Sequence, residues 1–289
     1  MQNSLIRSSI FLAGAAMLLT FAASSVVAQT PAPLPFALGE KLTYRVSVSK
    51  MGTVGSGSMW VEGPVDVRGT STWLLRFDFS AGLGPMKAVD RTSSWLDPQH
   101  MAAQRYYKHE KHVLAKRDER VEIFPSDRRW TAADGESGVS PTDEPLDELS
   151  FMYFIRTLPL APDSTYRFNR HFDVARSPTT VKVLGHEVIS TPAGRFETIA
   201  VEMRVRDSRR YRGEGVIRIN LSDDAMRIPV RIESAMPVLG TAVMTLQTFN
   251  NPTAPTGFLC QLVPQTCTPA TSPLSHAKTL SDLLAVVRK

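Results

Sequence analysis

Residues 41–48 read KLTYRVSV, and their pattern recurs along most of the chain. Leu42, Tyr44, Val46 and Val48 alternate with polar residues, which is typical of a strand with one buried face. The same period of two predicts further strands at 56–62, 73–79, 86–96, 102–109, 119–124, 166–172, 179–190, 195–206, 214–221, 226–233 and 241–249. Turn residues separate them at Gly63-Pro64, Gly82 to Pro85, Asp97-Pro98, Thr191 to Gly194 and Ser222 to Asp224. Strands this numerous, with short connections, predict an antiparallel sheet that curls or closes.

Residues 146–158 depart from this alternation, because they are apolar almost all round a helix. Asp147 is suited to cap the N-terminus of such a helix, and Pro159 ends it. A helix without a polar face must be covered, and a strongly curved sheet can cover it. The sequence therefore predicts a mainly β fold, a single curved antiparallel sheet or half-open barrel wrapped around one buried helix. The preceding segment, 132–144, is rich in Gly, Ser, Pro and acidic residues and predicts an exposed loop.

The N-terminal segment has the pattern of an export signal. Within residues 1–28, Arg7 precedes an apolar run, and Val26 and Ala28 place small side chains where signal peptidase requires them. We expect cleavage before Gln29, which makes the mature chain periplasmic and leaves it without a transmembrane segment. The alternative is an uncleaved membrane anchor, because the weakly apolar stretch is almost long enough to span a bilayer.

The rest of the chain divides into a β-rich domain at 36–249 and a tail at 250–289 that is rich in Pro and Thr. The tail contains both cysteines of the protein, Cys260 and Cys267. In an oxidising compartment these two are predicted to form a disulfide that closes a small loop. A redox-active pair is the alternative, but the C-x-x-C spacing is absent.

Neither a metal site nor a cofactor is predicted. His109 and His112 have a ligand-like spacing, but a strand there would turn them to opposite faces. Asp223 and Asp224 are better suited to a hairpin turn than to paired acid–base chemistry. The sequence contains no G-x-S-x-G, Walker or H-E-x-x-H motif. The net charge of +5 argues against a dedicated nucleic-acid binder.

Arginine is dense in the last third of the β-rich region, at positions 204, 206, 209, 210, 212, 218, 227 and 231. On neighbouring strands these guanidinium groups would converge and hold a phosphate or carboxylate group. Cross-strand pairing with the acidic residues nearby is the alternative. Met86, Met152 and Met244 offer adaptable apolar lining for the same ligand. The candidate ligand-binding residues are Arg204, Arg206, Arg218, Arg227, Arg231 and Met152.

Five landmarks carry a family resemblance over about residues 36–249. They are Gly39-Glu40-Lys41-Leu42-Thr43-Tyr44; Asp90 with Ser94 and Asp97; Asp147 and Ser150 followed by Arg156, Pro159 and Leu160; Thr191-Pro192-Ala193-Gly194-Arg195-Phe196; and Leu221-Ser222-Asp223-Asp224 with Arg227, Pro229 and Val230. Together they resemble the exported bacterial family catalogued as domain of unknown function 3108. The resemblance implies export and a β-rich fold. The family has no established activity, so no catalytic residue is transferred.

These observations favour a periplasmic or envelope protein that binds a hydrophobic or amphipathic, lipid-like ligand, with an anionic amphiphile as one form of it. The alternatives are an envelope hydrolase and a structural partner of an envelope assembly. A dry apolar trough would favour binding, and a polar cleft with convergent His, Asp or Ser would favour hydrolysis. An unpaired sheet edge would favour the structural partner.

Overall fold

A computed structural model describes residues 33–49, 51–83, 86–112, 115–208, 213–236 and 240–252. The chain divides into two units, Met1–Pro33 and Leu34–Lys289, and the fold lies in the second. The predicted signal peptide, the predicted disulfide between Cys260 and Cys267 and the tail beyond Pro252 lie outside the described residues. Those assignments stay predictions.

The described chain forms one fourteen-stranded sheet in which every strand pair is antiparallel. The strands are β1 (Lys41–Val48), β2 (Gly52–Val67), β3 (Thr70–Leu83), β4 (Met86–Asp97), β5 (Ala102–His112), β6 (Ala115–Phe124), β7 (Arg129–Ala132), β8 (Ser137–Val139), β9 (Thr165–Phe168), β10 (Thr179–Thr191), β11 (Gly194–Arg206), β12 (Glu214–Ser222), β13 (Pro229–Met236) and β14 (Gly240–Asn250). The helical elements are α1 (Glu148–Phe154) and the 3-10 turns η1 (Ile155–Thr157) and η2 (Val174–Arg176).

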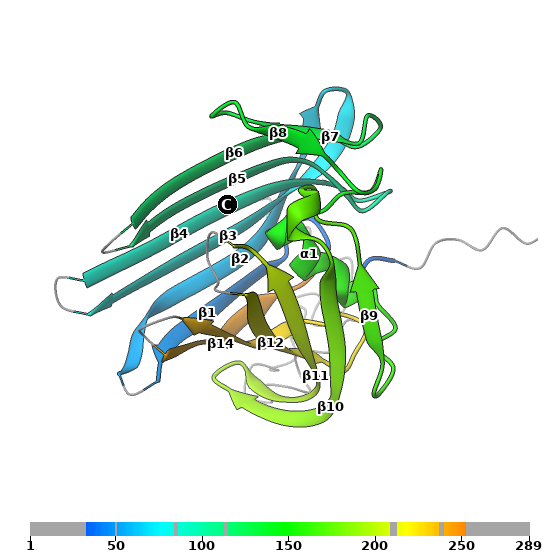
Figure 1. Cartoon of the computed structure of the whole chain (residues 1–289). Helices are drawn as coiled ribbons and strands as arrows, with labels where there is room; N and C mark the ends of the chain where they lie inside the picture. The colour runs from blue at the N-terminus through cyan, green and yellow to red at the C-terminus, as the bar shows by residue number, and fades with distance from the viewer. Residues whose placement is uncertain are drawn as a thin grey trace, which may run out of the picture. The chain divides into compact units, whose positions relative to one another are not determined.

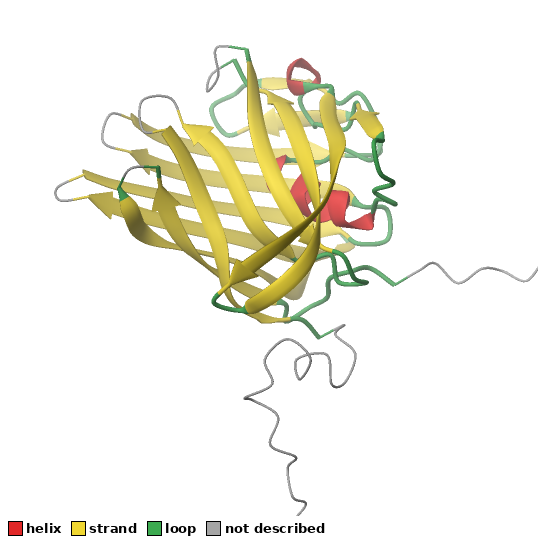
Figure 2. Cartoon of the chain, turned by 90° about the horizontal axis from the view of Figure 1, so that it is seen from below, coloured by secondary structure: helices red, strands yellow, loops and turns green. Residues whose placement is uncertain are grey.

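The strand order is β8-β7-β6-β5-β4-β3-β2-β1-β14-β13-β12-β11-β10-β9. Every neighbouring pair is consecutive in the chain except β1 and β14, whose pairing brings the two ends of the domain together, while β8 and β9 lie at opposite edges. The sheet curls around α1 without closing into a barrel, as Figures 1 and 2 show. Its edge strands, β8 and β9, are short. The predicted fold, a single curved antiparallel sheet around one helix, is therefore confirmed.

The helix is anchored at its N-terminus by a capping box. The Asp147 carboxylate accepts hydrogen bonds from the backbone N–H groups of Leu149 and Ser150, and the Ser150 hydroxyl accepts one from the N–H of Asp147. Ser94 of β4 donates a further hydrogen bond to the same carboxylate, which ties the helix to the sheet. The chain tightens into η1 and is extended at Leu158, because Pro159 disfavours helical geometry in the residue before it. The α-helix is consequently shorter than the predicted span of 146–158.

Four local predictions were wrong. The strand predicted at 166–172 ends at Phe168, and beyond it His171 forms only an isolated bridge with Leu146. Gly63-Pro64 is not a turn but a bulge within β2, where the pairing with β3 skips from Glu62 to Val65. The segment 132–144 is not entirely loop, since Ser137–Val139 forms β8 against β7. The predicted strand at 226–233 begins only at Pro229, because the Asp224 carboxylate accepts hydrogen bonds from the two backbone N–H groups after Ala225 and holds them in a turn.

Candidate functional site

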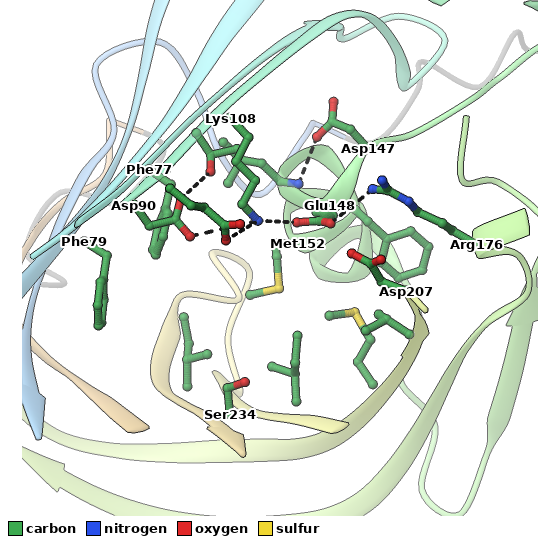
Figure 3. Close-up of a pocket in the computed structure, with 18 of the residues that line it drawn as sticks. Phe77, Phe79, Asp90, Lys108, Asp147, Glu148, Met152, Arg176, Asp207 and Ser234 are labelled. Atoms are coloured by element: carbon green, nitrogen blue, oxygen red, sulfur yellow. Dashed lines mark hydrogen bonds and ion pairs between the residues drawn. The ribbon is translucent and has the colours of Figure 1, made fainter. Parts of the chain in front are cut away.

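A cavity of about 720 Å³ lies between the concave face of the sheet and α1 (Figure 3). Most of its wall is apolar, from strands on both halves of the sheet and from the helix. The apolar residues are Met59, Phe77, Phe79, Leu149, Phe151, Met152, Met203, Val205, Ile217, Ile232, Ala235, Ala242 and Met244. The cavity exists because α1 is only seven residues long, about 10 Å, whereas β5 has eleven residues and extends about 36 Å. The helix therefore covers only part of the concave face.

Gly57 of β2 adjusts the shape of this wall. A Cβ atom there would lie 2.5 Å from the terminal methyl of Met244. The glycine thus leaves room for the methionine side chain in the cavity wall. Residues 55–58 lie inside the sheet between β1 and β3, next to a bulge where the β1–β2 register shifts.

A buried lysine organises the polar part of the site. Lys108 of β5 is only 4% exposed. Its Nζ lies 2.6 Å from a carboxylate oxygen of Glu148, 3.4 Å from one of Glu110 and 3.9 Å from one of Asp90 (Figure 3). Glu148 is the first residue of α1, so this ion pair joins the helix to β5. The ammonium group is compensated by carboxylates from three different elements.

Two arginines extend the polar cluster towards β6 and the end of β11. Arg176 of η2 lies 3.0 Å from Glu119 of β6 and 3.4 Å from Glu148. Arg117 of β6 lies 4.0 Å from Glu110 and 3.9 Å from Asp207, which follows β11. Charges of both signs therefore alternate across this end of the cavity.

Burial changes the titration of two residues that line the cavity. Loss of solvation raises the pKa of the Asp147 carboxyl to about 6, against the lowering effect of its hydrogen bonds from Ser94 and Ser150. Burial, together with the nearby Arg176 charge, lowers the pKa of His171 to about 3. The imidazole is therefore neutral at physiological pH.

Only two of the six predicted ligand-binding residues line the cavity. Met152 and Arg206 line it, whereas Arg204, Arg218, Arg227 and Arg231 are not among its lining residues. Each of these arginines lies next to an acid: Arg204 with Glu202, Arg206 with Glu214, Arg218 with Glu187, Arg227 with Asp223 and Arg231 with Glu233. Positions 209, 210 and 212 and the side chain of Met86 lie outside the described part of the chain.

Sequence reasoning missed Lys108, Glu110, Glu148, Arg117 and Arg176. The available signal was weak. In β5, Lys108 and Glu110 continue the inward-facing period that begins at the buried Tyr106. The period alone does not show which charged residues on that face are buried.

Of the two histidines at 109 and 112, the structure describes only the side chain of His109. His109 Nδ1 lies 2.7 Å from Asp118 on the neighbouring strand. Across the described ranges, no group of three or more His, Cys, Asp or Glu side chains is placed to hold a metal ion. Nor does the described part of the chain contain a helix long and apolar enough to cross a membrane.

The family model "Protein of unknown function (DUF3108)" matches residues 43–247. A beta-barrel-like protein of DUF1849 from Brucella abortus is similar in structure, with a TM-score of 0.53 and 10% identity over 75% of this chain and 99% of that one. An exported protein with YmcC-like fold from Bacteroides fragilis aligns at a TM-score of 0.29 and 12% identity, over 75% and 98% of the two chains. A lipoprotein from Parabacteroides distasonis aligns at 0.28 and 11%, over 75% and 97%. No curated protein matches the sequence.

Proposed function

The chain belongs to the DUF3108 family, and on the evidence of its cavity we propose that it is an exported envelope protein that binds a hydrophobic or amphipathic small molecule. The observation that carries this proposal is the space of about 720 Å³ between α1 and the sheet. Binding sites for small molecules have this size, a mainly apolar wall and a few polar groups that orient the ligand. Met152, Met203 and Met244 give the wall side chains that adapt to different ligand shapes.

The serine and the histidine that line the cavity are not arranged for hydrolysis by a serine nucleophile. Hydrolysis by a serine nucleophile needs a base within hydrogen-bond reach of the hydroxyl. Ser234 is the one serine among the described lining residues, and it lies across the cavity from Glu148 and Lys108 in Figure 3. His171, the one lining histidine described, accepts a hydrogen bond at Nδ1 from the backbone N–H of Asp173. Neither group is arranged for acyl transfer.

Export rests on the N-terminal sequence. The pattern of Arg7, apolar run and small residues before Gln29 is that of a cleaved signal peptide. A periplasmic location fits a carrier of lipid-like molecules, because such molecules need an apolar shelter in water between membranes.

Uptake of a fluorescent fatty-acid probe, 11-(dansylamino)undecanoic acid, tests the proposal. We expect saturable one-to-one binding with a blue-shifted emission. Ser234→Phe places a ring in the cavity and should weaken binding by about tenfold or more, since it takes space from the ligand without removing any charge. The melting temperature should not fall, because the ring fills empty apolar space.

Thr245→Phe is the matched control. Thr245 is in β14 next to Met244 and therefore on the opposite face of the sheet from the cavity. It should leave binding unchanged. Absence of saturable uptake by the wild-type protein would contradict the proposal. The structural-partner alternative would then gain, because β10 beyond Lys182 has no strand along its outer edge within the described ranges.

A further inference from the structure

We infer that the ligand of this cavity is amphipathic along its length: a rigid apolar body with several neutral hydroxyl groups on one side. This inference rests on the proposed function and specifies the class of ligand. It follows from where the polar and apolar parts of the wall meet. In a site for a linear fatty acid, the polar groups gather at one end of an apolar tunnel. Here they lie along one side.

The strand register shows this division. Two neighbouring rows of inward-facing residues cross the sheet from β3 to β5. The row nearer α1 reads Phe77, Thr92, Lys108, and the next row reads Phe79, Asp90, Glu110. In both rows the wall changes from aromatic to polar between β3 and β4. The boundary therefore runs parallel to the strands.

The other half of the sheet continues the apolar side. Met203 of β11 pairs with Ile217 of β12, and Ile232 of β13 pairs with Met244 of β14. All four line the cavity. Figure 3 shows the same division, with Phe77 and Phe79 on one side of Lys108, and Met152 between the polar cluster and Ser234. A bound molecule would thus contact apolar side chains over most of its surface and charged ones along one flank.

The charges on that flank are mixed in sign. Lys108 lies within 4 Å of Asp90, Glu110 and Glu148, and Arg117 lies within 4 Å of Glu110. A charged group placed on this flank would have to separate one of these pairs and leave a buried charge uncompensated, which is costly.

A hydroxyl group avoids that cost, because it donates to a carboxylate and accepts from an ammonium group at the same time. Several hydroxyls on one face of a rigid body would therefore bridge the existing pairs. A bare hydrocarbon chain on this flank would instead exclude water from the charges and offer them no hydrogen bond.

Equilibrium dialysis of two steroid acids with the full mature chain tests the inference. Cholate and 5β-cholanate share their rings and their carboxylate, but only cholate carries three hydroxyls on one face. We expect cholate, below its micellar concentration, to bind about tenfold more tightly, although it is the less hydrophobic of the two. The comparison isolates the hydroxyl groups from the charge and from the apolar body.

Variants of β5 test whether the polar flank of the cavity causes the preference for cholate. Lys108→Met should abolish the preference for cholate, whereas Lys111→Met, an exposed residue on the opposite face of the same strand, should preserve it. Because Lys108→Met also removes a buried ion-pair partner, Glu110→Gln provides a second variant of nearly the same shape, and it should reduce the preference as well.

The outcomes separate this inference from the proposed function. If 5β-cholanate binds as tightly as cholate or more tightly, the inference is overturned and small-molecule binding stands. If the preference survives in Glu110→Gln and in folded Lys108→Met, the polar flank is not its source and the inference is again overturned. If neither steroid nor the dansyl probe binds, both proposals fail.

Discussion

Replacement of Arg156 by methionine is expected to be one of the most destabilising substitutions in the protein. The guanidinium group donates hydrogen bonds to both carboxylate oxygens of Glu40, at 2.7 and 2.8 Å, and to the backbone carbonyls of Pro35 and Met226. Both side chains of the ion pair are 0% exposed. Arg156 follows α1 and Glu40 precedes β1, so the pair joins the helix to the middle of the sheet.

The expected loss of stability follows from the Glu40 carboxylate, which remains buried. Without Arg156, the buried Glu40 carboxylate keeps one described donor, Asn251, at 2.8 Å. Removing one partner of a fully buried ion pair costs about 3–5 kcal/mol, because the other charge is left uncompensated. For a domain of this size, such a loss lowers the melting temperature by about 10 °C.

Urea denaturation followed by tryptophan fluorescence and circular dichroism measures the effect. The double variant Arg156→Met/Glu40→Leu should be more stable than Arg156→Met alone, because the orphaned carboxylate is gone. Arg195→Met, whose ion pair with Glu197 is largely exposed, is the control and should change stability by less than about 0.5 kcal/mol. A single variant within about 1 kcal/mol of wild type would refute the reasoning.

Four further predictions concern titration and processing. The lowered pKa of His171 gives stability that is present above pH 6.5 and lost as the pH falls towards 3, so His171→Gln should flatten the acid limb of the urea-midpoint profile. The raised pKa of Asp147 gives stability that is present below pH 3.8 and lost as the pH rises through 6; Asp147→Asn, which can still cap α1, should remove that slope. N-terminal sequencing of the exported protein should begin at Gln29, and a chain that retains Met1 would exclude cleavage. Non-reducing peptide mapping should find Cys260 joined to Cys267, and free thiols in protein from the periplasm would contradict the disulfide.

Local chemistry made the fold largely predictable. Alternation identified the long strands, and Asp147 and Pro159 marked the limits of the helical segment. The errors occurred where one interaction overrides the local pattern. At Gly63 the chain bulges and continues as a strand, and at Asp224 a side chain holds the backbone in a turn. Neither the bulge nor the turn changes the alternation of apolar and polar residues, so that alternation could not reveal them.

The site was harder to predict, because it depends on pairing between distant segments. The arginine-rich region is conspicuous in sequence, but Met203 and Val205 occupy the concave face of β11, and the two-residue period turns Arg204 to the opposite face. Lys108 resembles a surface lysine until its neighbours are known. Its partner Glu148 is forty residues away in the chain and meets it only once α1 has docked on the sheet.

Fold and site share residues at the start of α1, and this limits how the proposed ligand specificity can be altered. Asp147 caps the helix and is tied to Ser94, while Glu148 is paired with Lys108. Substitutions at these positions therefore change how the helix docks as well as what the cavity presents to a ligand. Glu110 forms ion pairs with Lys108 of β5 and Arg117 of β6. The cap of α1 is made by Asp147 and Ser150, so Glu110→Gln should change ligand preference with less effect on folding than substitutions at Asp147 or Glu148.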